Sequence, residues 1–518
     1  MLKRTIALLL AVFVVLLGGC SNKKGNTSSD TENGSDGADI SVFSYKADTY
    51  CPIASNNQAN IRMLGIVYEG LISLNDTLMP EGCLAESWNV SGDGLNWTLK
   101  LRKNVLWHSG GEFTSDDVVY TVNQIKAMDT SAYRYNVSNI AGIKASGENE
   151  VKITLTKPIA NFVNLLYFPI IKKADDEINL TSYKPDGTGP YMFEDRNEGN
   201  VYYLVANKKW WGGHIVAQTV KVRMLPGGDT ALYAFSSGSI DLAPVENMDW
   251  GQFVDPTSAA YTSVATPVYD FLGINHRNRI LSLPEIREAI SLAIDRDEIV
   301  EKVMLGYAQP ANAPVRKEWF VRGSQDFEHK QNTDAAKRLL EENLWRFENN
   351  TYRKSIENVM HSAQFNILIN EENTVRENIA RVISDNLETF GIKATVTRVP
   401  YDTYKEKIQN GDYDAFIGSI ALSPDLDFLN IFGEGNMFGF QDDEMQQVMS
   451  EMQNKQSAED IKTAYAEFIN LFEQINPVVG LFFENTVMIY SKRIEEEGIK
   501  PSYFDMYRGI ENMRKGEA

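Results

Sequence analysis

Cysteine is scarce in this chain, with three residues in 518. Disulfide scaffolds are short and rich in cysteine, so that class of protein is excluded. Basic side chains are also in the minority, 50 against 70 acidic ones, and the formal net charge is -20. A surface of that sign repels phosphate backbones, so we expect no nucleic-acid partner.

Histidine and the short motifs of catalysis are equally sparse. The five histidines lack the spacing that zinc proteases require; they are His108, His214, His276, His329 and His361. The chain contains no G-x-S-x-G elbow, no C-x-x-C, no P-loop and no G-x-G-x-x-G. These absences favour a binding protein without a cofactor or a metal over an enzyme.

Long hydrophobic runs are missing except at the start of the chain. Residues 6–17 are apolar, Lys3 and Arg4 precede them, and the small residues and cysteine of 18–20 follow. Twelve residues are too few for a membrane span, which needs about 20. The pattern is that of a signal peptide over residues 1–20.

The end of this signal, Leu-Gly-Gly-Cys at 17–20, resembles the bacterial lipobox. The resemblance implies that Cys20 is acylated and anchors the protein on the outer face of the cytoplasmic membrane, extracellular or periplasmic. A plain secretory signal, in which Cys20 is incidental, is the alternative. Residues 21–39 have Ala38 as their one apolar side chain and are expected to form a flexible tether with a reach of roughly 25 Å.

The remaining cysteines, Cys51 and Cys83, could form a disulfide outside the cell. Each stands beside an apolar residue, Pro52 and Leu84, which favours burial. We therefore expect two buried free thiols, with the disulfide as the alternative.

The body of the chain is long enough for two or more domains of roughly 100–200 residues. Alternating apolar residues over 95–101 and 151–155 predict strands, and Thr114 to Asp117 predict a helix start. In the second half, apolar spacing and capping residues predict helices over 284–294, 296–305, 372–390 and 402–409, and strands over 392–396 and 413–417. This alternation predicts an α/β domain.

Several segments, in order, carry a family resemblance. They are Tyr68-Glu69-Gly70-Leu71-Ile72, Leu84-Ala85-Glu86-Ser87-Trp88, residues 99–105, Trp107-His108-Ser109-Gly110, residues 114–119, Gly187-Thr188-Gly189-Pro190-Tyr191, residues 207–213 and residues 287–296. Together they resemble the bacterial extracellular solute-binding proteins of family 5. That family includes the oligopeptide-, dipeptide- and nickel-binding lipoproteins of ABC importers.

The resemblance implies a two-lobed α/β fold of the periplasmic-binding-protein kind, type II. Lobe one would comprise residues 38–275 and 485–518, with an extra subdomain near 79–187, and lobe two residues 276–484. The implied function is capture of a peptide or peptide-like solute between the lobes by a monomer, with hinge closure and delivery to ABC permease subunits. Membrane attachment would come from the lipid anchor alone.

The ligand is harder to predict. Relatives hold a peptide amino group with an Asp in a W-x-x-D-x-x-x-P-x-x-F stretch, and an ungapped match on Phe428 puts Ala421 at that position. Candidate ligand-binding residues are Tyr50, Ser55 and Asn56 in lobe one, with Trp319, Tyr401, Ser423, Asp425 and Asp427 in lobe two. The alternatives are that the two Asp residues cap the next helix and that the aromatic residues only pack.

Other functions remain open from the sequence. Some relatives bind metal chelates, sugars or modified peptides. A surface-anchored hydrolase would need a nucleophile and base, or a metal cluster, in the cleft, which five scattered histidines disfavour. A receptor or chaperone with the same fold cannot be separated from a transporter by sequence.

Overall fold

Two long antiparallel strands join two hydrophobic cores in this protein. The computed structural model describes residues 39–174, 177–245, 248–323, 330–495 and 498–516. The predicted signal peptide with Cys20, the tether up to residue 38, and His329 lie outside the described residues. In those described ranges, no helix has the length and apolar character needed to cross a membrane.

The first core contains a mixed four-stranded sheet. The strand order is β1-β10-β9-β8, with β1 parallel to β10 and the other pairs antiparallel. These strands are β1 (Ile40–Tyr45), β8 (Tyr191–Asn197), β9 (Val201–Ala206) and β10 (Thr219–Leu225). Helix α1 (Gln58–Leu64) packs against β1, and its buried Met63 and Leu64 join the apolar side chains of the sheet.

A second sheet of the same core is entirely antiparallel, with the order β4-β5-β7-β6. Its strands are β4 (Ala85–Val90), β5 (Asn96–Leu101), β6 (Ile140–Ala145) and β7 (Glu150–Leu155). The same part of the chain contains the two-stranded sheet of β2 (Ile72–Leu74) and β3 (Pro80–Gly82), and the helices α2 (Ser115–Ala127), η1 (Tyr135–Val137) and η2 (Phe162–Tyr167). The strands expected from alternation over 95–101 and 151–155 are confirmed as β5 and β7.

A seven-stranded sheet extends from the first core into the second; its strand order is β11-β20-β12-β19-β17-β18, and β13 pairs with β20. Its strands are β11 (Leu242–Val245), β12 (Ala259–Ile274), β13 (Ala308–Pro310), β17 (Gln364–Asn370), β18 (Lys393–Val399), β19 (Ala415–Ala421) and β20 (Val478–Ser491). A three-stranded sheet stands apart, formed by β14 (Arg346–Glu348), β15 (Thr351–Ile356) and β16 (Val359–Ser362).

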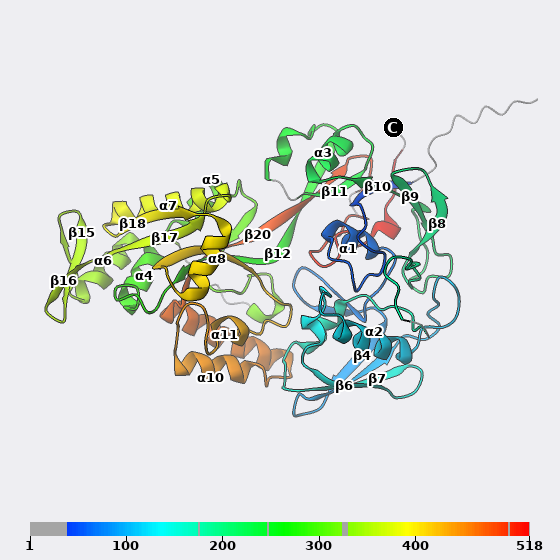
Figure 1. Ribbon diagram of the computed structural model, residues 1–518, viewed down its shortest axis with the longest axis horizontal. Helices are drawn as coiled ribbons and strands as arrows, with labels where there is room; N and C mark the ends of the chain where they lie inside the picture. Colours follow the sequence, from blue (N-terminus) through cyan, green and yellow to red (C-terminus); the bar gives the residue numbers. More distant parts are fainter. Residues whose placement is uncertain (1–38, 175–176, 246–247, 324–329, 496–497, 517–518) are drawn as a thin grey trace, which may run out of the picture. The chain divides into compact units, whose positions relative to one another are not determined.

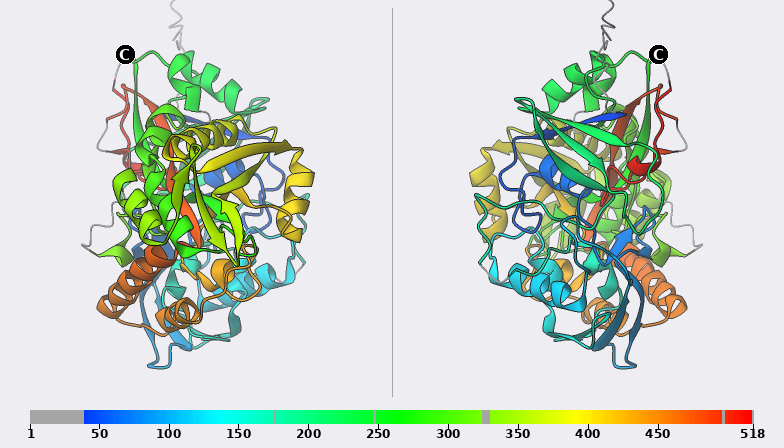
Figure 2. Two further views of the ribbon diagram at one scale, coloured as in Figure 1. Left: turned by 90° about the vertical axis from the view of Figure 1, so that its left-hand side faces the viewer. Right: turned by 90° about the vertical axis from the view of Figure 1, so that its right-hand side faces the viewer.

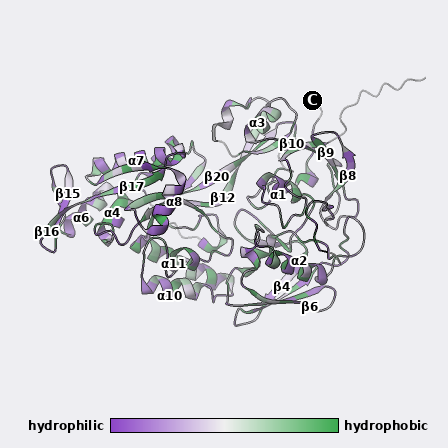
Figure 3. Ribbon diagram, in the orientation of Figure 1, coloured by the Kyte–Doolittle hydropathy of each residue, from purple (hydrophilic) through white to green (hydrophobic). Residues whose placement is uncertain are grey.

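Helices cover both faces of the seven-stranded sheet. The apolar side chains on its two faces belong to two separate clusters, and each cluster also contains residues of helices. The helices of this half and of the region before it are α3 (Gly228–Ser236), η3 (Met248–Gln252), α4 (Pro284–Ala293), α5 (Arg296–Lys302), η4 (Phe320–Arg322), α6 (Thr333–Glu342), α7 (Thr374–Phe390), α8 (Tyr401–Asn410), α9 (Leu429–Phe432), α10 (Asp443–Met452) and α11 (Ala458–Ile475), and η6 (Ile510–Asn512) follows near the C-terminus. Figure 3 shows hydrophilic and hydrophobic residues together along α7 and α11, as expected for half-buried helices.

The strands β12 and β20 belong to both cores. Val264 of β12 and Met488 of β20 lie in the first core, whereas Leu272 and Leu481 of the same strands lie in the second. Their pairing runs from Ala259 to Gly273, with register shifts between Ala265 and Tyr269 and between Asp270 and Phe271. Figure 1 shows the two strands side by side between the two groups of elements. The chain therefore passes between the cores along these two strands.

Helix ends follow the capping chemistry expected from the sequence. Thr114 and Asp117 form a capping box at the start of α2, and the Asn373 side chain accepts a first-turn N–H of α7. Helices α7 and α8 end at Gly391 and Gly411, which have φ values of 108° and 71°. Glycine adopts this left-handed conformation without steric cost, so these two positions stop the helices.

The spacing of Asp295 and Glu298 in the sequence predicts a capping box at the start of α5, and this prediction is wrong in part. Asp295 accepts the N–H of Glu298 at the start of α5, as a cap should. The Glu298 carboxylate, however, accepts from Lys302 and Asn386 and does not close the box on Asp295. The helix also ends at Lys302, earlier than the sequence suggested. Lys302, at the end of α5, and Asn386 of α7 donate to this carboxylate instead. The contact with Asn386 joins residues far apart in the sequence, so a local pattern does not reveal it.

Glycines of the matched segments allow close backbone contacts. A Cβ atom on Gly187 or Gly189 would lie 2.8 Å from the carbonyl carbon of Val67. The two ring nitrogens and the backbone of His108 bond the same turn, with Nε2 2.9 Å from the Gly189 carbonyl. The segments around residues 68, 108 and 188 therefore contact one another at one place. Their role there is structural, since each fixes the position of the others.

The two cysteines of the described residues are both free thiols. Cys51 is fully buried, and burial raises the pKa of its thiol to about 11. Cys83 is partly buried, and its thiol pKa is also raised by burial. The expectation of unpaired thiols is confirmed, and both stay protonated and unreactive at neutral pH.

Candidate functional site

The carboxyl ends of three strands lie at the same edge of the seven-stranded sheet. Strands β17, β18 and β19 are mutually parallel, and α7 and α8 begin where β17 and β18 end. Val268 of β12 pairs with Ala421 at the end of β19, and β12 continues from there back to the first core. The edge where ligands bind in α/β sheets therefore faces the first core.

Two acidic side chains lie at this edge, on the two strands that join the cores. Asp270 of β12 is 3% exposed and accepts a hydrogen bond from Ser419 Oγ of β19 at 2.7 Å. Glu484 of β20 is close enough for its charge to act on Asp270. Burial and then the charge of Glu484 raise the pKa of Asp270 well above its usual range, and burial raises the pKa of Glu484.

The guanidinium of Arg376 lies near this pair, but its charge does not outweigh the effect of burial on the two carboxyl groups. The charge of Arg376, in the first turn of α7, lowers both carboxyl pKa values against the larger effect of burial. Arg376 also donates to Asn370 Oδ1 at 2.9 Å and lies 5.4 Å from the ring centroid of Tyr404. The sequence reasoning missed both acids, although an acid inside an otherwise apolar strand pattern is a usable signal.

Trp319 lies in a narrow hollow where both cores contribute side chains. The hollow is lined by Asn75, Asp76, Leu78, Ala265, Thr266, Pro267, Trp319, Tyr503 and Phe504. The Trp319 ring packs edge-on against Phe483 at 5.3 Å and is 3% exposed. The backbone N–H of the next residue, Phe320, donates to the Thr77 carbonyl at 2.9 Å. Of the sequence-predicted candidates, Trp319 thus lies beside residues of both cores, and its ligand contact stays a prediction.

Asp425 and Asp427 make contacts between the two cores. Tyr135 donates to Asp425 Oδ2 at 3.0 Å, and Lys157 pairs with Asp427 Oδ2 at 2.8 Å. Asp427 Oδ1 also accepts the N–H of Leu429, the first residue of α9, at 3.2 Å. The capping alternative thus has a matching contact for Asp427. Their part in ligand binding stays a prediction.

Further bonds support this contact between the cores. The Asn161 amide donates to the Tyr465 hydroxyl at 3.2 Å, and Asn164 donates to the Pro424 carbonyl at 3.2 Å. Gln453, after α10, accepts the backbone N–H of Ala160. Both views in Figure 2 show the orange helices beside the cyan segments of the first core, in agreement with these bonds. The loop over residues 423–430 is therefore joined to the part of the chain that contains the antiparallel sheet β4-β5-β7-β6.

Ser55 and Asn56 are organised around Asp48. Ser55 Oγ donates to Asp48 Oδ1 at 2.7 Å, and the Asn56 N–H donates to Oδ2 at 2.8 Å. Ser55 is fully buried, whereas Asn56 is exposed and donates to the Thr130 carbonyl at 3.1 Å. These residues fix the shape of the loop before α1. Their proposed ligand contacts remain predictions.

The remaining candidates lie apart from one another. Tyr50 is half-buried against Phe193 and Tyr202 at ring distances of 5.3 and 6.4 Å. Tyr401 opens α8 and is 49% exposed. Ser423 is half-buried in the loop after β19. Ala421 is exposed at the end of β19.

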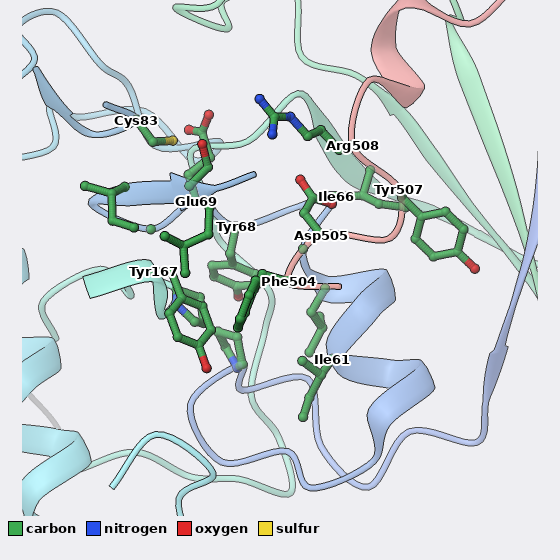
Figure 4. Close-up of a pocket in the computed structure, with 18 of the residues that line it drawn as sticks. Ile61, Ile66, Tyr68, Glu69, Cys83, Tyr167, Phe504, Asp505, Tyr507 and Arg508 are labelled. Carbon is green, nitrogen blue, oxygen red and sulfur yellow. The ribbon is translucent and has the colours of Figure 1, made fainter. Parts of the chain in front are cut away.

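A separate cavity of about 460 Å³ lies inside the first core (Figure 4). Residues of α1, Ile66, Tyr68 and Glu69, and residues of the C-terminal segment 504–508 line it. Its buried Glu69 accepts from Trp210 Nε1 at 3.0 Å, Trp211 Nε1 at 2.9 Å and Thr188 Oγ1 at 2.8 Å. Three donors satisfy this carboxylate, which therefore ties three matched segments together as structure.

Metal binding has no ready donor set here. Throughout the described ranges, no three His, Cys, Asp or Glu side chains gather as a metal site. The Asp270–Glu484 pair has two carboxyl groups and an Arg beside it, which suits a hydrogen-bonding cation better than a metal ion.

Comparison with known proteins identifies the wider group. The family model described as "Bacterial extracellular solute-binding proteins, family 5 Middle" matches residues 79–438. The chain is 25% identical to the oligopeptide-binding protein AppA of Bacillus subtilis over 526 aligned positions, covering 95% of this chain and 96% of AppA. It is 23% identical to heme-binding protein A of Haemophilus influenzae, covering 83% of this chain and 84% of that protein.

Solved structures share the fold. The crystal structure of NikZ from Campylobacter jejuni in complex with Ni(L-His) superposes with a TM-score of 0.67 at 21% identity, covering 92% of this chain and 99% of NikZ. The predicted two-lobed α/β fold, type II with an extra subdomain in lobe one, is confirmed by this likeness.

Proposed function

The chain belongs to the bacterial extracellular solute-binding proteins of family 5, and from this we propose that it captures a peptide or peptide-like solute for an ABC importer. The solute is held between two lobes and handed to the permease subunits, without chemical change. The likeness to AppA along 95% of the chain supports the peptide class.

The main observation behind this proposal is the pair of strands that joins the two cores. In the proposal, lobe one comprises residues 38–275 and 485–518, with the extra subdomain near 79–187, and lobe two residues 276–484. β12 and β20 act as the hinge, and the binding edge of the second sheet lies beside them. A ligand that contacts both lobes stabilises the closed form, because only contacts made in that form shift the equilibrium.

Mass spectrometry tests the capture of a solute directly. We expect protein purified from its own host to carry a di- to pentapeptide or a related compound, seen in native spectra as a mass above that of the polypeptide. The control is the same protein after unfolding, dialysis and refolding, which should lose this mass and regain it from supplied peptide. A co-purified metal chelate or sugar would contradict the peptide class, and turnover of a supplied peptide would contradict a binding protein.

We also propose that Cys20 carries the lipid anchor of a monomer held on the outer face of the membrane. The supporting features are the signal-like residues 1–20 and the Leu-Gly-Gly-Cys sequence that ends them. One acyl chain binds a membrane only marginally, so stable anchoring requires more than one chain.

The substitution Cys20→Ala should therefore release the protein from the membrane fraction into the surrounding fluid. Immunoblots of membrane and soluble fractions measure this change. Cys83→Ala is the matched control, since it removes a cysteine of the body and should leave the protein in the membrane fraction. If Cys20→Ala stays membrane-bound, the anchor is elsewhere.

A further inference from the structure

One oxygen of the Asp270 carboxylate has no protein donor. Oδ1 accepts from Ser419, while the buried Oδ2 finds no hydrogen-bond donor among the described residues. A buried polar atom of this kind carries a desolvation cost, which a hydrogen-bond donor would offset. The Glu484 carboxyl interacts with the Asp270 side chain, but when ionised it is also an acceptor and has no proton to donate to Oδ2.

Two carboxyl groups this close cannot both be ionised cheaply. Burial raises the pKa of each group, and the charge of Glu484 raises that of Asp270 further. One shared proton removes the repulsion and supplies the missing donor for Oδ2. The charged and titratable groups around the pair are Arg376 of α7, Tyr404 of α8, Tyr269 of β12, Tyr503 of the C-terminal segment and Arg316, whose Nη1 donates to the Glu484 carbonyl.

We propose that the Asp270–Glu484 pair receives a protonated amine of the solute, which takes the place of the shared proton. This inference rests on the proposed function, since the pair lies at the proposed hinge. The exchange balances: a solute ammonium binds, both carboxylates become ionised, and one proton leaves to solvent. No covalent bond forms or breaks.

The chemistry of an ammonium fits this place. It has three N–H donors, enough for one oxygen of each carboxylate and one further acceptor. Bonds from an ammonium to carboxylates are about twice as strong as those between neutral groups. Ser419, which bonds Asp270, is exposed, and in this proposal the solute approaches the pair from the side of Ser419. Glu484 is only partly buried and completes the approach.

The substitution Asp270→Asn tests the shared proton in the ligand-free protein. Asparagine keeps the acceptor for Ser419 and offers a permanent N–H donor to Glu484, so it imitates the protonated state. Because the folded pKa values are raised, the parent is stabilised at low pH and loses this stability as pH rises above about 4. We therefore expect the Tm of Asp270→Asn minus that of the parent to increase from pH 5 to pH 8.

Two further variants control this measurement. Glu484→Gln should behave like Asp270→Asn, because it also removes one of the two charges. Asp402→Asn removes a carboxyl whose side chain is 94% exposed and should show no pH-dependent difference from the parent. A Tm difference for Asp270→Asn that does not change with pH overturns the shared proton.

Calorimetric titration with trialanine and N-acetyltrialanine tests the amine. We expect the parent and Asp402→Asn to bind trialanine with release of protons, measured in two buffers of different ionisation enthalpy. N-acetyltrialanine, and trialanine with Asp270→Asn, should bind at least about tenfold more weakly. Equal binding of trialanine by Asp270→Asn overturns the inference and leaves the proposed function intact. A parent that binds neither peptide overturns the peptide function, and the amine site with it.

Discussion

Replacement of Gly480 by alanine should lower the free energy of unfolding by about 3 kcal/mol. Gly480 lies in β20, where the strand enters the second core. An added Cβ would overlap the Asn312 carbonyl, lying 2.6 Å from its carbon, and would overlap the Tyr269 hydroxyl as well. The first obstacle is backbone and the second is a buried side chain bonded to it, so neither moves cheaply.

Thermal and urea unfolding of the purified variant measure this loss. Gly142→Ala in β6 is the matched control, because a Cβ there has no atom within 4 Å and the substitution also falls in a strand. We expect the control to stay within about 0.5 kcal/mol of the parent. A similar loss in both variants would show that the close approach at Gly480 does not determine the effect.

Much of the second half of the fold can be predicted from local patterns. Caps such as Asn373 and stops such as Gly391 and Gly411 act within one helical turn, so a short window contains all that is needed. The order of predicted helices and strands from 372 to 417 gives β18 and β19, whereas β17 (Gln364–Asn370) lies before that segment and is not predicted. The position of the sheet edge at their carboxyl ends follows from the topology.

The acidic pair could not be predicted in the same way. Asp270 and Glu484 are 214 positions apart, and only the pairing of β12 with β20 brings them together. A window around either residue shows one acid in an apolar strand, which indicates something unusual without naming its partner. The long crossing strands, rather than any local motif, create this site.

Asp425 and Asp427 show the opposite case. Their position before a short helix is visible in the sequence, and one of the two readings, a cap, has its contact at Leu429. Their partners Tyr135 and Lys157 precede them by 290 and 270 positions. The sequence therefore identifies both carboxylates as special, whereas contacts between the cores decide what surrounds them.

Loss of the Arg296 guanidinium should cost about 4 kcal/mol of stability. Arg296 is 3% exposed and bonds the Gly480 carbonyl at 2.8 Å, the Ser291 carbonyl at 2.9 Å and Asn312 Oδ1 at 3.1 Å. Burial lowers its pKa to about 10, so it remains charged at neutral pH. Arg296→Met fills similar space but leaves these acceptors without donors. Unfolding in urea, followed by tryptophan fluorescence, measures the loss.

Arg279→Met is the control for Arg296→Met. Arg279 is 49% exposed and pairs with Glu357, which is 76% exposed, so its loss should change stability by less than about 1 kcal/mol. Because Arg296 bonds the carbonyl of Gly480, the double variant Gly480→Ala with Arg296→Met should lose less than the sum of the two single losses. Additive losses would mean that the guanidinium and the glycine act separately. Shared loss would mean that β12, β20 and α5 form one rigid unit at this junction, from which β12 and β20 extend to the first core.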